Sequence, residues 1–269
     1  MKETKQTLQE LICNFARQKG KNTLVVLDDL LSYIVGFFDP NGEALDGWGY
    51  DKQSNVKFHE MMVTYFAEMD ERLKHLEWCD LWGDLYMSLI TKGDSKGQFF
   101  TPANICDMMA KVSIDEDVIN GCGIQTTFGK RISVNDPASG SGRNLLSAAV
   151  EITKLTNRKP YLIAEDIESI CCKMAAVNIA MHGWYGEVVC HNTLEEPDKM
   201  RFGYIINETM YPFPTNVPSI RKCTNPKSFV SCAIWVKDKE TTTVNAKTHH
   251  NANLGAKLGA NKSKQLKIF

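Results

Sequence analysis

Apolar residues recur at helical spacing in the first ninety residues of this 269-residue chain. Side chains three and four positions apart share one face of a helix, so such stripes predict amphipathic helices with a buried apolar face. The two clearest stripes are Leu8, Leu11, Ile12 and Phe15, and Phe58, Met61, Met62, Tyr65, Phe66, Met69 and Leu73. Trp78, Trp82, Leu85 and Met87 indicate a further apolar helix. We interpret the stripes as core-forming rather than as contact surfaces, with turn clusters between them at 39–42 and 46–49.

The pattern changes to alternating strands and helices in the middle of the chain. A short β-branched strand at 131–134 leads into Asn135–Asn144, a loop of small and polar residues, and apolar residues then return at helical spacing over Leu145–Ile152. A second apolar strand, Tyr161–Ala164, ends in an acidic pair before Ile167. This succession predicts a βαβ unit of the kind that binds a nucleotide-like cofactor.

The small-residue loop holds the candidate binding chemistry. Gly140 and Gly142 permit positive φ and close backbone approach, and the N-terminus of the next helix offers unpaired N–H groups. Asp166 lies where a carboxylate can bind ribose hydroxyls. A nicotinamide fingerprint needs a glycine at Leu145 and no acid at Asp136, so the pattern points away from NAD. Taken alone, a Gly-x-Gly pair also fits an ordinary surface turn.

Three phrases in matching order resemble one family. Gly97–Pro102 (GQFFTP) is similar to its GQFYTP segment, Asp136–Gly142 (DPASGSG) to its DPACGSG loop, and Ala164–Gly183 to its second strand and helix. The family is the S-adenosylmethionine-dependent DNA adenine methylases, specifically the modification (M) subunits of type I restriction systems. Ser139 replaces the usual cysteine of the loop, and Arg143 replaces a third glycine. The resemblance implies an α/β fold with a Rossmann-like, doubly wound, mainly parallel sheet behind a helical N-terminal region.

The resemblance also implies a binding site for S-adenosylmethionine at the carboxyl ends of the strands. Asp136 would lie near the amino group of the cofactor, Gly140 and Gly142 near its methionine portion. Asp166 would bind the ribose. Asn192 stands where relatives often have an aspartate facing the adenine amino group, although a turn or N-cap residue is the alternative. The expected cofactor-binding residues are Gln98, Phe99, Thr101, Pro102, Asp136, Ala138, Gly140, Gly142, Asn144, Asp166, Ile167 and Asn192.

The catalytic motif of that family, Asn-Pro-Pro-aromatic, is degenerate in this chain. After a predicted strand at Phe202–Ile206 the sequence reads Asn207-Glu-Thr-Met-Tyr-Pro-Phe213. In the family, the Asn and a proline carbonyl hold the target amine for in-line attack on the sulfonium methyl, and the aromatic ring stacks on the extruded base. Glu208 falls at the position of the Asn. Two hypotheses follow: a shifted motif in which Asn207 is catalytic with Tyr211 or Phe213, and a decayed or repurposed site.

Chain length limits the domain organisation. We expect a helical N-terminal region at 1–92, a methyltransferase-like domain at 93–236 and a basic, flexible tail at 237–269. Phe229–Val236 is the one clear strand candidate after the degenerate motif, so the catalytic domain is shortened. We expect DNA sequence specificity to come from another subunit or from the N-terminal region, because we find no segment large enough for a separate target-recognition domain.

Charge is distributed unevenly, although the net charge is −1. Residues 1–220 hold 21 basic and 30 acidic side chains, whereas residues 221–269 hold 10 and 2. The composition from Lys237 onward favours a mobile tail that neutralises DNA phosphates, and a solvated terminus without function is the alternative. Nine cysteines without CxxC spacing indicate reduced, buried thiols, and the sequence shows no metal-binding pattern.

We expect a cytoplasmic, soluble protein, because no apolar run approaches about 18 residues and the first residues form no signal peptide. The favoured function is methylation of adenine N6 in DNA within a restriction-modification complex. Its expected partners are DNA and a specificity or second methylase subunit, without a membrane. One alternative is a catalytically inactive cofactor-binding or partner-binding module. A second is a methyltransferase for protein or a small molecule, because sheets of this type serve many acceptors.

Overall fold

The structure is a computed structural model, and it describes residues 6–40, 50–90, 99–121, 124–126, 129–208, 217–234 and 266–267. Several predictions lie outside these ranges: the turn at 46–49, the residues Gln98, Tyr211 and Phe213, and nearly all of the basic segment from Lys237. Within the described ranges, no helix is both long enough and apolar enough to cross a membrane.

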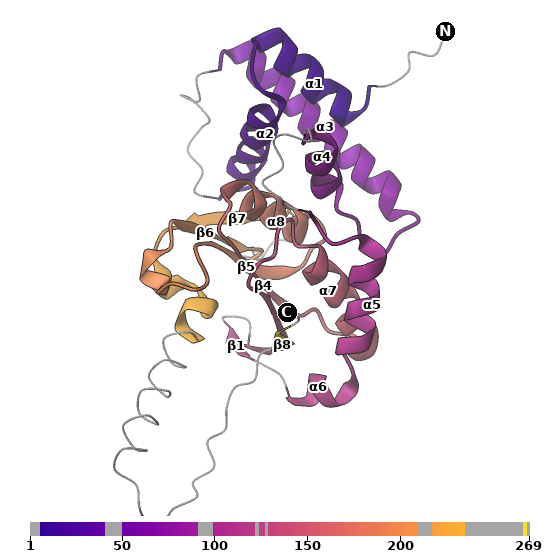
Figure 1. The fold of residues 1–269 in the computed structure, drawn as a ribbon, viewed down its shortest axis with the longest axis vertical. Coiled ribbons are helices and arrows are strands. Elements are labelled where there is room, and N and C mark those ends of the chain that lie inside the picture. The colour runs from indigo at the N-terminus through magenta and orange to yellow at the C-terminus, as the bar shows by residue number, and fades with distance from the viewer. Residues whose placement is uncertain are drawn as a thin grey trace, which may run out of the picture.

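Four helices form the N-terminal part of the molecule, at the top of Figure 1. They are α1 (Leu8–Lys19), α2 (Thr23–Phe37), α3 (Lys52–Leu73) and α4 (Leu81–Leu89). Polar side chains fix where the helices begin, since Thr7 forms a capping box at α1 and Asp51 caps α3. Gly20 ends α1 in the left-handed conformation, with φ of 62°. The helices predicted from both apolar stripes are confirmed, whereas the next helix begins at Leu81 rather than at Trp78.

The remaining elements are four helices, two 3-10 turns and eight strands in the described part of the chain, and helix and strand alternate from β3 to β5. The helices are α5 (Ala103–Ser113), α6 (Glu116–Gly121), α7 (Arg143–Thr156) and α8 (Ser169–Met181), with 3-10 turns η1 (Pro197–Lys199) and η2 (Pro226–Ser228). The strands are β1 (Ile124–Thr126), β2 (Gly129–Arg131), β3 (Ser133–Asp136), β4 (Tyr161–Asp166), β5 (Tyr185–Cys190), β6 (Phe202–Ile206), β7 (Ile220–Cys223) and β8 (Leu266–Lys267). The predicted βαβ unit is present as β3–α7–β4.

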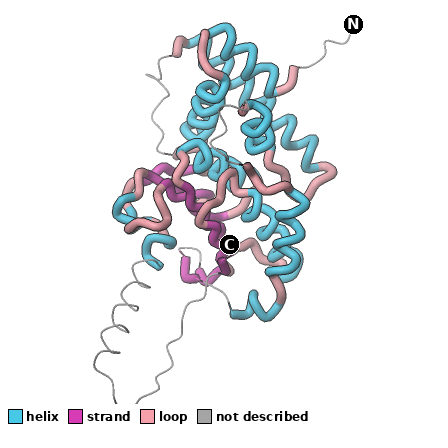
Figure 2. The backbone as a smooth tube through the Cα atoms, in the orientation of Figure 1, coloured by secondary structure: helices cyan, strands magenta, loops and turns pink. Residues whose placement is uncertain are grey.

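Six strands form one mixed sheet in the order β7-β6-β5-β4-β3-β8, and β1 and β2 pair separately. In Figure 2 the strands lie in the middle of the molecule, with the N-terminal helices to one side. The neighbours β3, β4 and β5 are parallel, so their carboxyl ends meet at one edge. By contrast, β6 and β7 are antiparallel additions beside β5. The α/β architecture is confirmed, and the direction of β6 decides the position of Asn207, the residue that directly follows it.

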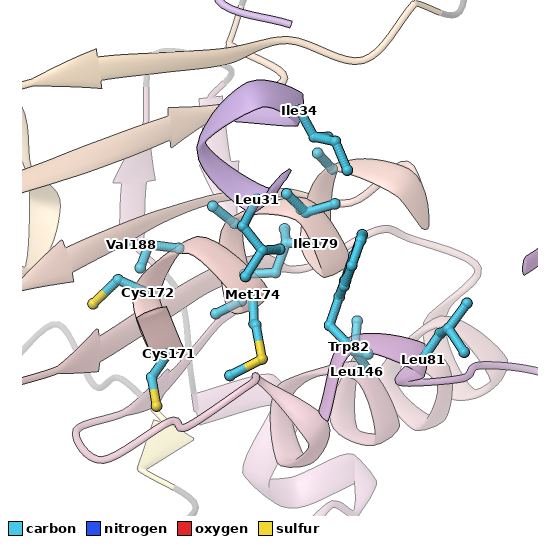
Figure 3. Packing of buried hydrophobic residues seen from close by; sticks show 14 of the residues in the cluster. Leu31, Ile34, Leu81, Trp82, Leu146, Cys171, Cys172, Met174, Ile179 and Val188 are labelled. Carbon is cyan, nitrogen blue, oxygen red and sulfur yellow. The ribbon is translucent and has the colours of Figure 1, made fainter. Parts of the chain in front are cut away.

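One face of the sheet is covered by α7 and α8, and the N-terminal helices pack against this layer. Leu31 and Ile34 of α2, Trp82 of α4 and Met174 of α8 belong to one buried cluster, which Figure 3 shows from close by. The same cluster extends to Val188 of β5. The helical region and the sheet therefore share a single core, which holds α4 against the elements that carry the site.

The opposite face of the sheet is covered by the segment after η2, where the sequence predicts a strand at Phe229–Val236. That prediction is wrong, because residues 230–234 are helical. The carboxylate of Glu187, fully buried on β5, accepts hydrogen bonds from the N–H groups of Val230 (2.9 Å) and Ser231 (2.7 Å) at the start of this helix. A tertiary acceptor for free N–H groups thus outweighs the β-branched character of the segment.

Candidate functional site

Two glycines with left-handed backbones shape the loop between β3 and α7: Gly140 (φ 53°) and Gly142 (φ 91°). A Cβ atom at Gly140 would lie 2.8 Å from the ring of Phe100, so a side chain there would displace the aromatic ring that lies over the loop. At Gly142, the N-cap of α7, a Cβ atom would lie 3.5 Å from Ala175 of α8. The predicted positive φ is confirmed at both glycines. Only at Gly140 does the missing Cβ also make room for a close neighbour, the ring of Phe100.

Asp166 closes this loop from the end of the adjacent strand. Its Oδ2 accepts a hydrogen bond from the N–H of Gly140 (2.9 Å), and its Oδ1 accepts one from the N–H of Glu168 (2.8 Å). Burial raises the pKa of this carboxyl above its ordinary value. Each oxygen of a carboxylate can accept a further hydrogen bond, so Asp166 can also bind the hydroxyl groups of a ligand.

A pocket of about 450 Å³ lies beside this contact, at the carboxyl ends of β3, β4 and β5. Its volume is within the range of small-molecule sites. Three of its apolar side chains are strongly exposed, Phe99 at 75%, Ile167 at 57% and Leu194 at 93%. Of the described residues that line it, none is Lys or Arg, and Asp166 is the only carboxylate. The pocket therefore favours a ligand with rings and hydroxyl groups and without negative charge.

Half of the predicted cofactor residues line this pocket. They are Phe99, Ala138, Gly140, Asp166, Ile167 and Asn192. Sequence reasoning missed Phe100, Pro137, Cys171, His191, Thr193 and Leu194. Five of these missed residues flank a predicted residue or share its loop, so adjacency was a usable signal. Cys171 of α8 lacked even that signal, because only the packing of α8 against the sheet brings it to the pocket.

The other predicted cofactor residues that are described lie in or beside the loop between β3 and α7 and do not line the pocket. Asp136 is only 1% exposed, its Oδ1 accepts from the N–H of Ala138 (3.1 Å), and its Oδ2 accepts from Nδ2 of Asn144 (3.2 Å). Burial raises the pKa of Asp136. Thr101 and Pro102 precede α5, and Pro102 is its N-cap. The carboxylate of Asp136 therefore braces the loop, and Asp136 is not among the described residues that line the pocket, so its contact with a cofactor stays a prediction.

Arg143, which stands in place of the third glycine of the motif, ties the loop to α4. Its Nε lies 2.5 Å from Oδ2 of Asp80, and its Nη2 lies 2.6 Å from Oδ1 of Asp84. Its Nη1 donates to the carbonyl oxygen of Thr101 (3.4 Å). Asp80 is almost fully buried and also accepts a hydrogen bond from the Ser141 hydroxyl (2.5 Å). The loop, α4 and the segment before α5 therefore meet at one buried ion pair.

Asn192 lies at the pocket, but its side-chain amide is engaged in a turn. Its Oδ1 accepts a hydrogen bond from the N–H of Leu194 (3.1 Å), and its Nδ2 donates to Oε1 of Glu195 (3.1 Å). This is the local hydrogen bonding that makes asparagine common in turns. The turn role that the sequence left open for Asn192 is therefore present, in addition to its place in the lining.

The predicted catalytic residue Asn207 lies at the other edge of the sheet from the pocket. Because β6 is antiparallel to β5, Ile206 pairs with Gly186 near the start of β5, whereas the pocket lies beyond Cys190 at its end. At about 3.3 Å per residue, these ends are roughly 13 Å apart along the strand. The structure therefore does not bring Asn207 to the residues around Asp166.

The side chain of Asn207 has a structural task where it lies. Its backbone is left-handed, with φ of 56°. Its Nδ2 donates to the carbonyl oxygen of Trp184 (2.8 Å), and its Oδ1 accepts from the N–H of Ser219 (2.9 Å). The amide therefore anchors the connection between β6 and β7, and the catalytic role of Asn207 stays a prediction. Tyr211 and Phe213 lie outside the described residues.

A glycine loop joined to a strand-end carboxylate, with a pocket at the carboxyl edge of parallel strands, is an arrangement typical of α/β proteins that bind nucleotide-like ligands. A family model described as N-6 DNA methylase matches residues 78–243, more than half of the chain. The chain therefore belongs to the N-6 DNA methylase family. The match begins just before α4, so it includes Asp80 as well as the glycine loop and Asp166. No curated protein and no solved structure matches the chain.

Proposed function

We propose that this chain binds S-adenosylmethionine beside Asp166 and serves the methylation of adenine N6 in DNA, as a subunit of a modification complex of the restriction-modification type. Family membership supports the class of reaction. The hydrogen bond between Asp166 and Gly140 is the observation that carries the proposal for the cofactor, because it joins the glycine loop and the acidic strand end in the wall of one pocket.

The chemistry of the pocket fits this cofactor. S-adenosylmethionine has an adenine ring, ribose hydroxyls and a sulfonium cation, and it has no phosphate. Asp166 offers acceptors for the hydroxyls, while Phe99, Ile167 and Leu194 offer apolar surface to the ring. A dinucleotide fits less well, since its pyrophosphate favours cationic side chains, and none is among the described lining residues. When bound, the sulfonium supplies an activated methyl group.

We also infer that β3–α7–β4–α8–β5 is the cofactor-binding half of a doubly wound, Rossmann-like methyltransferase sheet. The parallel order of β3, β4 and β5 and a pocket at their carboxyl ends support this inference. A specificity or second methylase subunit would read the DNA sequence. The excess of basic residues after position 220 supports contacts with DNA phosphates.

A cofactor-binding module that transfers no methyl group is the second candidate, and the position of Asn207 favours it. Transfer to an amine needs a group that holds the amine in line with the sulfonium methyl. Asn207 lies at the other edge of the sheet and bonds Trp184 and Ser219 instead. In the first candidate function the amine is held by other groups at the pocket or by a partner subunit.

Methyl transfer from labelled S-adenosylmethionine to duplex DNA of mixed sequence separates these functions. The chain is incubated alone and with cell extract, and digested DNA is analysed for N6-methyladenine. Label in that base, lost in Asp166→Asn, supports the methyltransferase. Measurable binding of the cofactor without label in DNA supports the module, and label in protein or metabolites supports a different acceptor. Failure to bind the cofactor contradicts all three.

A further inference from the structure

Three basic residues lie at the edge of the sheet opposite the pocket, where the parallel strands begin. Arg131 ends β2 and lies two positions before the start of β3, while Arg158 and Lys159 lie just before the start of β4. Nη1 of Arg131 donates to the carbonyl oxygen of Lys159 (3.2 Å), so the two segments are in contact. We call these three residues the basic edge. The pocket, by contrast, lies at the ends of the same strands.

Two side chains of the basic edge are held by the residues at the start of β5. The guanidinium of Arg131 lies 4.4 Å from the centroid of the Tyr185 ring. Nζ of Lys159 lies 5.7 Å from the centroid of the Trp184 ring and donates to the carbonyl oxygen of Gly183 (2.8 Å). Aromatic rings and carbonyl oxygens attract cations but carry no net charge. These contacts therefore position the two cations without neutralising them.

The positive charge of the basic edge is not balanced by acidic side chains of the described residues. Lys154, a few positions earlier in α7, pairs with Glu77 (2.6 Å), whereas Arg158 and Lys159 are exposed and pair with no described carboxylate. Glu208, which follows β6 at this edge, is already paired with Arg221. Since residues 1–220 hold more acidic than basic side chains, an unbalanced basic surface stands out there. Such a surface fits a polyanion.

We propose that the basic edge binds the phosphate backbone of DNA. The chain belongs to a family of DNA methylases, so DNA is the polyanion that the family match favours. Cations that are fixed along one edge suit the regularly spaced phosphates of a duplex. Trp184 is buried, and Tyr185 packs against the core while Arg131 lies over its ring, so we expect no stacking on bases and no dependence on base sequence. The inference goes beyond the proposed function, because it adds a DNA-binding surface away from the pocket.

Fluorescence anisotropy of a short labelled DNA duplex, titrated with the full chain at several salt concentrations, tests this surface. The double variant Arg158→Gln/Lys159→Gln removes two positive charges and keeps Arg131. At about 50 mM salt it should bind the duplex about tenfold more weakly, and the slope of log affinity against log salt should become less steep by about 2, because each lost phosphate contact contributes about 0.9.

The matched control is Lys52→Gln/Lys111→Gln, which removes the same charge from exposed positions of α3 and α5. It should keep the affinity for the duplex within about twofold and the salt dependence unchanged. The basic residues after position 220 are the same in both double variants, so the difference between the variants reports on the basic edge alone.

The inference is overturned if Arg158→Gln/Lys159→Gln keeps the affinity and the salt dependence of the wild-type chain, or if the control double variant loses as much. The loss should be the same for two duplexes of unrelated sequence, and a loss confined to one of them overturns the assignment to phosphates. Binding of the wild-type chain to vesicles of phosphatidylserine and phosphatidylcholine, without binding to the duplex, overturns it in favour of a membrane surface.

Calorimetric titration with S-adenosylhomocysteine separates this inference from the proposed cofactor site. The wild-type chain and Arg158→Gln/Lys159→Gln should bind that ligand with equal affinity, because the basic edge lies away from the pocket. Absence of duplex binding by the wild-type chain overturns the basic edge and leaves cofactor binding to its own test. Thermal unfolding checks that the variants fold. If the double variant does not, Arg158→Gln alone decides, with a salt slope less steep by about 1.

Discussion

Asp166 has two tasks in the proposed site. It holds the glycine loop through the N–H of Gly140, and it is the only carboxylate among the described residues that line the pocket. Asp166→Asn keeps the shape of the side chain but removes its charge. We expect S-adenosylhomocysteine to bind about tenfold more weakly, since hydrogen bonds to charged groups contribute about 1.5–3 kcal/mol. Calorimetry measures this, with Asp70→Asn on the exposed side of α3 as the matched control.

The same contact predicts that ligand binding weakens in acid. Burial raises the pKa of Asp166 above 3.8, so as the pH falls the carboxylate takes up its proton earlier than an exposed aspartate does. The protonated carboxyl is a poorer acceptor for ribose hydroxyls, so affinity declines with falling pH. Asp166→Asn lacks this proton and should lack this decline. Titrations from neutral to mildly acidic pH measure the effect, and identical pH profiles for the two proteins would count against it.

The contact between α7 and α4 connects the cofactor loop to the N-terminal helices. Arg143→Met removes the cationic partner of the buried Asp80 carboxylate and should lower the free energy of unfolding by about 3 kcal/mol, because a buried charge without a counter-charge is costly. It should also weaken ligand binding, since Arg143 bonds Thr101 beside the Phe99–Phe100 segment. Urea unfolding and calorimetry measure the two effects.

The same helix provides a matched control for Arg143→Met. Lys154 of α7 also pairs with the N-terminal region, through Glu77 (2.6 Å), but both side chains are largely exposed. Lys154→Met should change the free energy of unfolding by less than about 1 kcal/mol and leave ligand affinity unchanged. If Arg143→Met and Lys154→Met lowered the free energy of unfolding equally, burial would not explain the contribution of the Arg143–Asp80 ion pair to stability.

Local sequence patterns predicted where helices and strands lie along the chain better than they predicted which elements pack against one another. The strand at Phe202–Ile206 has the bounds that the sequence predicts, because its apolar run is short and bounded by polar residues. Nothing in that run specifies pairing with β5 in the antiparallel direction, so the position of Asn207 could not be predicted. The prediction of a strand at Phe229–Val236 is wrong because the acceptor for the first N–H groups of the helix there is Glu187, more than forty positions away in sequence.

The candidate site was predictable to a similar extent. The glycines and Asp166 could be identified because their backbone and charge requirements are local. The partner of Arg143 could not, since Asp80 lies in a helix that only the shared core brings to the loop.

The whole sheet has two edges with different tasks, a pocket at the carboxyl ends of β3 to β5 and a structural turn at Asn207. Asn207→Ala removes the side-chain hydrogen bonds to Trp184, Ser219 and Ala180, and it places alanine, which adopts the left-handed conformation less readily than asparagine, at φ 56°. We expect a loss of about 2–3 kcal/mol in the free energy of unfolding, with unchanged affinity for S-adenosylhomocysteine. Denaturant unfolding and calorimetry measure both.

Asn157 separates the backbone effect from the hydrogen bonds. It ends α7 with φ of 53° and is exposed, so Asn157→Ala carries the left-handed backbone cost of about 1 kcal/mol. The excess loss in Asn207→Ala is then the contribution of its contacts with Trp184, Ser219 and Ala180. Loss of ligand binding in Asn207→Ala, with the fold intact, would instead return this residue to the active site.

The most direct test of the central claim, that the pocket beside Asp166 binds S-adenosylmethionine, is a calorimetric titration of the full chain with that cofactor. We compare the wild-type chain with Ile167→Arg, which places a cation at an exposed position of the lining, and with Ile167→Leu. We expect one cofactor per chain for the wild type and Ile167→Leu, and no measurable binding for Ile167→Arg at an unchanged unfolding temperature. Absence of binding to the wild-type chain, or equal affinity of Ile167→Arg, would contradict the claim.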